Sequence, residues 1–422
     1  MPKYYIKTYG CQMNVNDSEV MAGLLDHAGY SQSDSPETAD VILINTCCVR
    51  QKAEDKAFGY ALGLVAPKMR KPGRIIGIIG CIAEKEKDHI FKKLPFIDLV
   101  VGPGQEAHLV HLLEDIRQGG RNVISTGEHC GDYPSYSAKR TPSTQAFVTI
   151  MFGCNNFCSF CVVPYVRGKE ISRPVKDIIE EVRGLDKKIF KEVVLLGQNV
   201  NSYGEKGLAN LLEEISLIDG VERFRFLTSH PRDMSEEIID AVRDLPKVCE
   251  YFHLPLQSGD DEILKKMNRG YTADHFRKLV AVIRSKIPDA TITSDAIAGF
   301  PGETEGQFMN TLKLIEELEL DLVNTFSYSS RPGTPAEKMP GQLPDEVRSE
   351  RLKRLMDVVE ASALKRNRSL VGKELEVLVF GKGGGRTRGN KVVNFKATNE
   401  QIGKSMKVKI TGASAWGLKA SL

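Results

Sequence analysis

The chain has 422 residues and a net charge of +3, with 41% hydrophobic and 27% charged residues. These values are typical of an ordinary globular protein of two or three domains. A membrane span is excluded, because no run approaches the roughly 18 apolar residues that one needs. The N-terminus also lacks the apolar core of a secretory signal, so we expect a cytoplasmic protein with no membrane partner. In that reducing compartment nine cysteines are more typical of metal ligands or catalytic thiols than of disulfides.

Residues 1–118 alternate strand-like runs with helical patterns, which predicts a doubly wound parallel sheet. The three clearest runs are KYYIKTYG, DVILINT and RIIGIIG. Cys11, Cys47 and Cys81 lie where these runs end, and the carboxyl ends of parallel strands form the ligand-binding edge of an open sheet. We therefore predict that the three thiols converge and hold an iron–sulfur cluster. Three separate buried cysteines are the alternative.

Residues 119–145 are rich in Gly, Ser, Thr and Pro, which predicts a linker. Residues 146–368 then contain six strand-like runs, most of them separated by helical patterns: FVTIMFG, EVVLLGQNV, RFRFLTSHP, YFHLPLQSG, TITSDAIAGF and LVNTFSYSS. Six βα units predict a partial (β/α)6 barrel. The active site of such a barrel lies at the carboxyl ends of its strands.

Three cysteines follow the first of these barrel runs with the spacing C-x3-C-x2-C: Cys154, Cys158 and Cys161. A structural zinc site is the alternative, but it needs a fourth Cys or His to close its tetrahedron. Thiolates also favour iron–sulfur clusters. A [4Fe–4S] cluster held by three cysteines leaves one iron free for a ligand, and the predicted barrel mouth is where such an open position is useful.

Residues 369–422 contain short alternating runs with Gly-rich turns, which predicts a small antiparallel β-barrel of oligonucleotide-binding type. We expect Gly383–Gly385 to be one of those turns. The segment carries ten Lys or Arg against three Glu, and a basic module indicates a polyanionic partner such as RNA. The residues predicted to contact phosphates or stack on a base are Arg386, Arg388, Lys391, Phe395 and Lys396.

The motif C-x3-C-x-aromatic-C on a partial barrel, with Phe160 as the aromatic, resembles the radical S-adenosylmethionine (SAM) superfamily. VVPYVRG after the motif, and TYGCQMN, INTC and GC-x-A in the first segment, resemble its methylthiotransferase branch. GRT and NKVVNF near the C-terminus resemble the TRAM domain of that family. The family pattern selects Cys47 over its neighbour Cys48. We expect Cys48, Cys130 and Cys249 to be bystanders.

The resemblance implies two [4Fe–4S] clusters, one on the barrel cysteines and an auxiliary one on Cys11, Cys47 and Cys81. It also implies that SAM binds at the free iron of the barrel cluster. By the same resemblance, the turn AGFPGE holds SAM together with polar strand ends, although such groups also cap helices. The residues predicted to bind SAM are Phe160, Gln198, Asn199, Gln257, Ser294, Asp295, Gly299 and Glu303.

The activity implied by this resemblance is methylthiolation of C2 of N6-isopentenyladenosine next to the anticodon of tRNA, with two SAM molecules and sulfur from the auxiliary cluster. The implied partners are the tRNA anticodon stem-loop, an electron donor such as flavodoxin or ferredoxin, and proteins that supply sulfur and clusters. A sister enzyme acting on threonylcarbamoyladenosine in tRNA or on a ribosomal-protein aspartate is an alternative. An RNA-binding protein with structural clusters is a more distant one.

Overall fold

The computed structural model describes residues 1–48, 51–129, 138–204 and 206–421. The chain forms two compact units, which we describe separately. The first unit comprises Met1–Thr141, Phe147–Asn155 and Val162–Ile171, and the second comprises Pro142–Ala146, Asn156–Cys161 and Ser172–Leu422. Within the described residues no helix is long and apolar enough to cross a membrane.

The first unit is built on a parallel sheet with the strand order β2-β1-β3-β4-β5-β6. Its strands are β1 (Lys3–Tyr9), β2 (Ser31–Gln32), β3 (Val41–Thr46), β4 (Ile75–Gly80), β5 (Leu99–Val101) and β6 (Val123–Ser125). The helical segments are α1 (Gln12–His27), α2 (Gln51–Gly63), α3 (Val65–Arg70), α4 (Cys81–Glu86), α5 (His89–Lys93), η1 (Glu106–His108), α6 (Leu109–Arg117) and α7 (Val163–Val166). A two-stranded sheet joins β8 (Met151–Phe152) to β9 (Ile171–Ser172).

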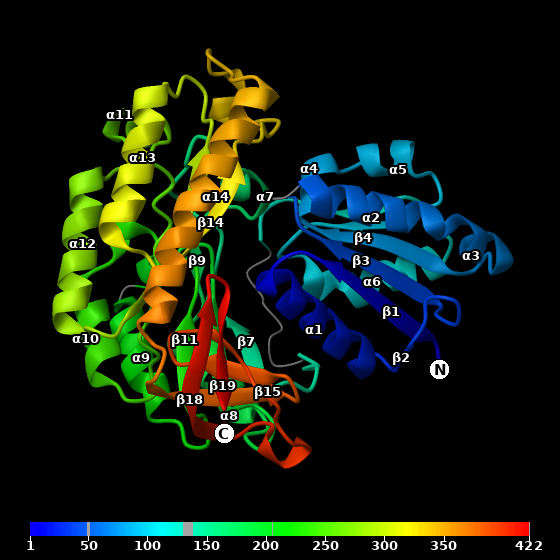
Figure 1. Ribbon diagram of the computed structural model, residues 1–422. Helices are drawn as coiled ribbons and strands as arrows, with labels where there is room; N and C mark the ends of the chain where they lie inside the picture. The colour runs from blue at the N-terminus through cyan, green and yellow to red at the C-terminus, as the bar shows by residue number, and fades with distance from the viewer. Residues whose placement is uncertain (49–50, 130–137, 205, 422) are drawn as a thin grey trace. The chain divides into compact units, whose positions relative to one another are not determined.

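Helices cover both faces of this sheet, as predicted for a doubly wound fold (Figure 1). The central strands β3 and β4 are buried along their whole length, which is why they read as continuous apolar runs. One core lies under α1 and α6 and the other under α2, α4 and α5. The short strands β2, β5 and β6 were not predicted, and β6 lies inside the segment predicted as a linker.

The six strand positions predicted for the partial barrel are present as the sheets β11-β10-β7 and β12-β13-β14. Five of these strands belong to the second unit, whereas β7 begins in the second unit and ends in the first. These strands are β7 (Gln145–Thr149), β10 (Glu192–Leu196), β11 (Arg223–Phe226), β12 (Tyr251–His253), β13 (Thr291–Ala298) and β14 (Leu322–Ser327). The helical segments are α8 (Val175–Gly184), η3 (Val200–Ser202), α9 (Gly207–Ser216), η4 (Pro231–Asp233), α10 (Glu236–Asp244), α11 (Asp261–Lys266), α12 (Ala273–Lys286), α13 (Glu305–Leu318), η5 (Pro335–Lys338) and α14 (Asp345–Arg368).

Local sequence explains where several of these helices begin. The side chains of Ser235, Asp260, Thr272 and Thr304 each accept a hydrogen bond from a backbone N–H in the first turn of α10, α11, α12 and α13. Such caps satisfy donors that have no partner inside the helix. These helices therefore begin at defined residues.

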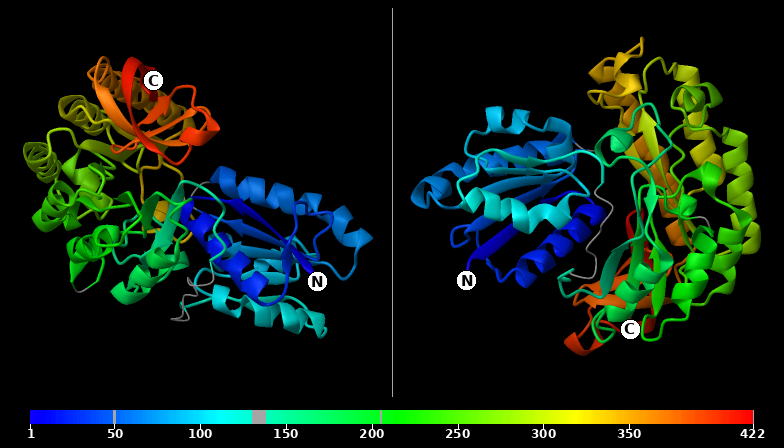
Figure 2. Two further views of the ribbon diagram at one scale, coloured as in Figure 1. Left: turned by 90° about the horizontal axis from the view of Figure 1, so that it is seen from below. Right: turned by 180° about the vertical axis from the view of Figure 1, so that it is seen from behind.

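The C-terminal residues form a small closed barrel with the strand order β15-β16-β17-β19-β18 (Figure 2). Its elements are β15 (Glu374–Gly381), β16 (Gly384–Thr387), β17 (Val392–Asn394), η6 (Asn399–Gln401), β18 (Ser405–Ser414) and β19 (Gly417–Ser421). All strand pairs are antiparallel except β17 with β19. The interpretation of Gly383–Gly385 as a turn is wrong in part, because β16 begins at Gly384.

Candidate iron–sulfur and SAM site

Cys11, Cys47 and Cys81 lie at the carboxyl ends of three adjacent strands of the first unit. Strands β1, β3 and β4 are neighbours in register, with Tyr9 paired to Thr46 and Thr46 paired to Gly80. The Cys47 thiol forms hydrogen bonds with both Cys11 and Cys81. Cys47 and Cys81 are buried, whereas Cys11 is exposed. The structure therefore brings the three predicted thiols together, while iron binding itself stays a prediction.

The backbone before Cys81 can approach β3 closely because residue 80 is glycine. Gly80 has a φ of +91°, and a Cβ there would lie 2.7 Å from both the Asn45 side chain and the Thr46 carbonyl oxygen. Glycine adopts such a φ without the steric penalty that other residues incur. The turn therefore places Cys81 at the first position of α4, directly beside Cys47.

A buried ion pair lies beside these thiols. Arg167 donates to the Asp17 carboxylate at 2.9 Å, and both side chains are nearly inaccessible. The Arg167 guanidinium also hydrogen-bonds the Cys81 thiol. Arg167 belongs to the VVPYVRG motif, but nothing in that motif predicts that this side chain reaches the N-terminal cysteines.

Neighbouring groups shift the pKa values of these thiols. Hydrogen bonds from Cys47 and Cys48 hold the pKa of Cys81 well below its usual value. A hydrogen bond from Cys47 lowers the pKa of Cys11 to about 6, and the charge of Arg167 acts in the same direction. Thiolates are the form that binds metals, so the donor set suits a cationic iron cluster.

Two of the cysteines predicted as bystanders can be placed. Cys48 is buried in the core under α2 and α4, and its thiol hydrogen-bonds Cys81, which raises the pKa of Cys48. Cys249 is buried in the second unit and accepts a hydrogen bond from Arg225 at 3.4 Å. Cys130 lies outside the described residues.

The chemistry of the thiol set fits an iron–sulfur cluster better than a single ion. Three soft sulfur donors at one sheet edge are the ligands that such clusters take. No group of three or more His, Cys, Asp or Glu side chains within the described ranges is arranged to hold a metal ion. The thiols hydrogen-bond with one another in this conformation, so they have to separate when each binds a different iron.

The cysteine motif of the predicted barrel runs through a loop that follows β8. The Cys154 N–H donates to the Gly168 carbonyl oxygen at 3.2 Å within the first unit, and the Cys161 N–H donates to the Cys158 carbonyl oxygen at 2.9 Å within the second. Phe160 packs against an apolar cluster that contains Phe300. Phe160 therefore holds the loop by apolar contact.

The end of α11 fixes the loop of residues 156–159. The backbone N–H of Ser159 donates to the Met267 carbonyl oxygen at 3.0 Å, and the Ser159 hydroxyl donates to the Lys266 carbonyl oxygen at 2.8 Å. The Asn268 side-chain amide donates to the carbonyl oxygens of Asn156 and Phe157, both at 3.1 Å. Four hydrogen bonds thus hold the segment that carries Cys158.

Several polar side chains at the strand ends of the second unit are buried without a hydrogen-bond partner among the described residues. The atoms are Gln198 Oε1, Asn199 Oδ1, Ser229 Oγ, His230 Nε2 and Gln257 Oε1. Buried polar atoms are normally satisfied, so these atoms fit a polar ligand such as SAM. Gln198, Asn199 and Gln257 were predicted for that role, whereas Ser229 and His230 were missed although they lie in the strand-end sequence TSHP.

Ser294 and Asp295, which were both predicted to bind SAM, lie in different environments. Ser294 is completely buried and accepts a hydrogen bond from the Leu256 N–H at 2.9 Å, so its side chain joins two strands instead of facing a ligand. Asp295 accepts from Asn324 at 2.9 Å and lies 3.4 Å from His253. Its carboxylate remains partly accessible.

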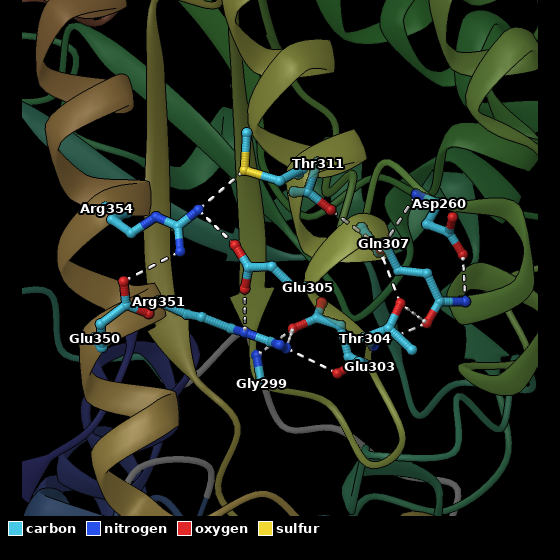
Figure 3. Close-up of polar contacts among 12 residues, drawn as sticks. Asp260, Gly299, Glu303, Thr304, Glu305, Gln307, Thr311, Glu350, Arg351 and Arg354 are labelled. Atoms are coloured by element: carbon cyan, nitrogen blue, oxygen red, sulfur yellow. Dashed lines mark hydrogen bonds and ion pairs between the residues drawn. The ribbon is translucent and has the colours of Figure 1, made fainter.

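Glu303 braces the AGFPGE turn from within. Its Oε2 accepts from the Gly299 N–H at 2.8 Å and from Arg351 at 2.9 Å (Figure 3). The carboxylate is completely buried, and its other oxygen, Oε1, has no hydrogen-bond partner among the described residues. Glu303 therefore holds the turn, and contact with SAM stays a prediction. Gly299 has a φ of +79°, which explains the glycine at this position.

The residues predicted to bind RNA have mixed environments. Phe395 is only 8% exposed and lies in the core of the C-terminal barrel, so it is placed to pack and not to stack on a base. Arg388 pairs with Glu250 at 2.7 Å and Lys391 pairs with Asp321 at 2.8 Å. Arg386 donates to the Asn390 carbonyl oxygen at 3.1 Å, whereas Lys396 is exposed.

Three family models match the chain. The uncharacterised protein family UPF0004 matches residues 3–102, the radical SAM superfamily matches residues 148–315, and the TRAM domain matches residues 368–422. These matches follow the three segments predicted from the sequence. The C-terminal barrel is therefore of the TRAM type.

Curated relatives match over nearly the whole chain. A tRNA-2-methylthio-N(6)-dimethylallyladenosine synthase of Acetivibrio thermocellus is 44% identical and covers 99% of this chain and 90% of its own length. A protein of the same name from Thermoanaerobacter pseudethanolicus is 45% identical, covering 99% and 92%. Among solved structures, the radical SAM methyltransferase TsrM from Kitasatospora setae, with cobalamin and a [4Fe–4S] cluster, superposes with a TM-score of 0.62 at 15% identity over 80% of this chain and 77% of TsrM. At that identity it shows the fold alone.

Proposed function

This chain belongs to the tRNA-2-methylthio-N(6)-dimethylallyladenosine synthase family of radical SAM enzymes, and we propose that it adds a methylthio group to C2 of N6-isopentenyladenosine next to the anticodon of tRNA. The structural observation that carries the proposal is the convergence of Cys11, Cys47 and Cys81 at one sheet edge. A second set of three cysteines, Cys154, Cys158 and Cys161, comes earlier in the sequence than the strand ends that carry buried polar atoms without a hydrogen-bond partner among the described residues. Two thiol sets on two parallel-sheet folds suit an enzyme that both activates a C–H bond and delivers sulfur.

Each of the two iron–sulfur clusters has a set of cysteines that would hold it. Cys154, Cys158 and Cys161 would hold the [4Fe–4S] cluster at which SAM binds. Cys11, Cys47 and Cys81 would hold the auxiliary cluster. With SAM bound, these groups supply the radical that activates C2, the sulfur that fills the position and the methyl group that completes it. Radical chemistry is needed because this aromatic C–H bond has no useful acidity.

Side chains of this chain would bind SAM and orient both clusters. Gln198, Asn199 and Gln257 present buried carbonyl oxygens that can accept from the amino groups of SAM. Arg167 places a positive charge beside the auxiliary thiols. The brace formed by Glu303 and Arg351 keeps the Gly299 turn in one conformation.

The relatives favour tRNA isopentenyladenosine over the sister substrates, because both curated matches carry the same substrate in their names. The basic C-terminal barrel suits the anticodon stem-loop as the partner. A flavodoxin or ferredoxin is our proposal for the electron donor. Sulfur and cluster supply proteins in the cytoplasm are our proposal for renewal of the auxiliary cluster.

The decisive experiment separates the two cysteine sets by substitution. After anaerobic reconstitution the wild-type chain should bind about eight iron atoms, four for each [4Fe–4S] cluster. The Cys154→Ala variant should lose 5′-deoxyadenosine formation on reduction with dithionite. The Cys11→Ala variant should still cleave SAM but should not thiolate an isopentenylated anticodon stem-loop, as measured by nucleoside mass spectrometry.

The control is Cys249→Ala, which removes a cysteine that lies outside both sets. It should leave the iron content and SAM cleavage unchanged. About four iron atoms in the wild type would rule out two clusters. Full thiolation by Cys11→Ala would show that the auxiliary thiols are not the sulfur-delivery site.

A further inference from the structure

Arg269 is a buried arginine whose guanidinium reaches one of the barrel cysteines. Its Nη1 donates to Cys158 Sγ at 3.3 Å, its Nη2 donates to the Pro255 carbonyl oxygen at 2.8 Å, and its Nε donates to the Tyr271 hydroxyl at 3.2 Å. Each of the three nitrogens therefore has a partner of its own. Because the guanidinium is planar and rigid, these bonds fix the N–H that points at sulfur.

No carboxylate among the described residues forms an ion pair with the Arg269 guanidinium. Arg269 is 4% exposed. Burying an uncompensated cation is unfavourable. The other buried arginines of this unit that contact Glu192 and Glu303 do have such partners, so Arg269 is placed to meet an anionic group that binds at Cys158.

The field of this charge extends over the neighbouring strand ends. Burial, together with the charge of Arg269, lowers the pKa of His230 to about 3. His253 and Asn324 lower the pKa of Asp295 against the effect of burial, and Arg269 contributes in the same direction. The guanidinium thus acts electrostatically on the strand-end side where SAM is proposed to bind.

The contact is set by the local backbone and not by a flexible tail. Arg269 lies three residues after the end of α11, and its N–H donates to the Leu264 carbonyl oxygen at 3.0 Å. The preceding residues Met267 and Asn268 hold the loop that carries Cys158, as described above. The cysteine and the arginine are therefore two ends of one hydrogen-bonded arrangement.

We propose that Arg269 is a positioning residue that holds the Cys158 sulfur and raises the reduction potential of the cluster at Cys154, Cys158 and Cys161. This inference rests on the proposed function, since it needs that cluster. Reduction adds one negative charge to an iron–sulfur cluster. Hydrogen bonds to the sulfurs and nearby charge set such potentials, so a cationic donor stabilises the reduced state.

The test is a redox titration followed by electron paramagnetic resonance. The full chain with Cys11, Cys47 and Cys81 changed to Ala isolates the barrel cluster. In that background Arg269→Gln should lower the ratio of reduced to oxidised cluster about tenfold at a fixed potential, equivalent to a shift of about 59 mV for one electron. Arg269→Lys keeps the charge and should give a value between the two.

Arg225→Gln is the matched control, because Arg225 is equally buried and donates to the sulfur of Cys249. Its potential should equal that of the parent. An unchanged potential in Arg269→Gln, or an equal shift in the control, overturns the inference. If Arg269→Gln does not take up iron, Arg269→Lys decides, and a potential equal to the parent rejects the role. A parent chain without a cluster or without SAM cleavage would instead refute the proposed function.

Discussion

Arg351 and Glu303 form an ion pair with almost no access to water, and the pair closes the turn after β13. Such pairs add little net stability compared with apolar contacts, but removal of one partner is costly because the other charge stays buried. Burial raises the pKa of Glu303, and the Gly299 N–H and Arg351 oppose that rise. Arg351 therefore favours the ionised form of a carboxylate that burial disfavours.

Replacement of Arg351 by Met should lower the free energy of unfolding by about 3 kcal/mol at neutral pH. The loss should shrink near pH 4, because a group whose folded pKa is raised destabilises the fold only as the pH rises above its unfolded value of about 4.3. Urea denaturation at both pH values measures this difference.

Arg354→Met is the control on the same helix, since its ion pairs with Glu305 and Glu350 are partly exposed. Its cost should stay within about 1 kcal/mol. Equal losses in both variants, or a loss in Arg351→Met that does not change with pH, would contradict the role of the buried pair.

Residue positions at strand ends were predictable, whereas partners across the fold were not. The three N-terminal cysteines follow apolar runs, so the strand pattern alone places them at one edge. Arg269 is 111 positions from Cys158, and periodicity carries no information about such pairs. For the same reason, charge counts assigned Arg388 and Lys391 to RNA although Glu250 and Asp321 already pair with them.

Strand β16 shows what element prediction misses. Its first residues are glycines, which are rare in strands, so the segment resembled a turn. A Cβ at Gly385 would lie 2.0 Å from the Leu378 carbonyl oxygen on β15. The glycine is therefore required by the close approach of two paired strands, and the barrel closes through it.

Gly385→Ala should destabilise the C-terminal barrel by about 2 kcal/mol, within the range for overpacked sites. Gly383→Ala is the matched control two residues earlier, where a Cβ would meet no atom within 4 Å. Thermal unfolding followed by circular dichroism compares the two. A control that loses as much stability as Gly385→Ala would show that the contact with Leu378 is not the cause.

At the scale of the second unit, buried charges join the C-terminal barrel to the βα strands. Arg223 pairs with Glu376 at 2.6 Å, and Arg225 donates to the Arg388 carbonyl oxygen at 2.7 Å. Helix α14 also lies against both β14 and β18. Part of the positive charge counted in the sequence is therefore used in contacts within the protein and is not available to bind RNA.

This division of charge predicts different salt effects for two substitutions in the barrel. Lys396→Ala removes an exposed cation and should reduce the slope of log affinity against log salt for an anticodon stem-loop by about 1. Arg388→Ala removes a cation that Glu250 already neutralises, so its slope should stay at the wild-type value. Fluorescence anisotropy over a series of salt concentrations measures both slopes, and a lower slope in Arg388→Ala would mean that this arginine contacts phosphate.

The order of the three segments was predictable because each has its own periodicity and composition. The division into two compact units was not, because the chain crosses between them several times around residues 142–172. Such crossings leave no signal in hydrophobic patterning. The short strands β2, β5 and β6 were missed because two or three residues are too few to show a period.

The hydrogen bonds from the end of α11 to residues 156–159 require no iron. The loop that carries Cys158 is therefore held by the protein's own hydrogen bonds, and a preorganised site loses little conformational entropy when it binds a ligand. We therefore expect that a chain that has lost the proposed cluster can bind iron and sulfide again without unfolding.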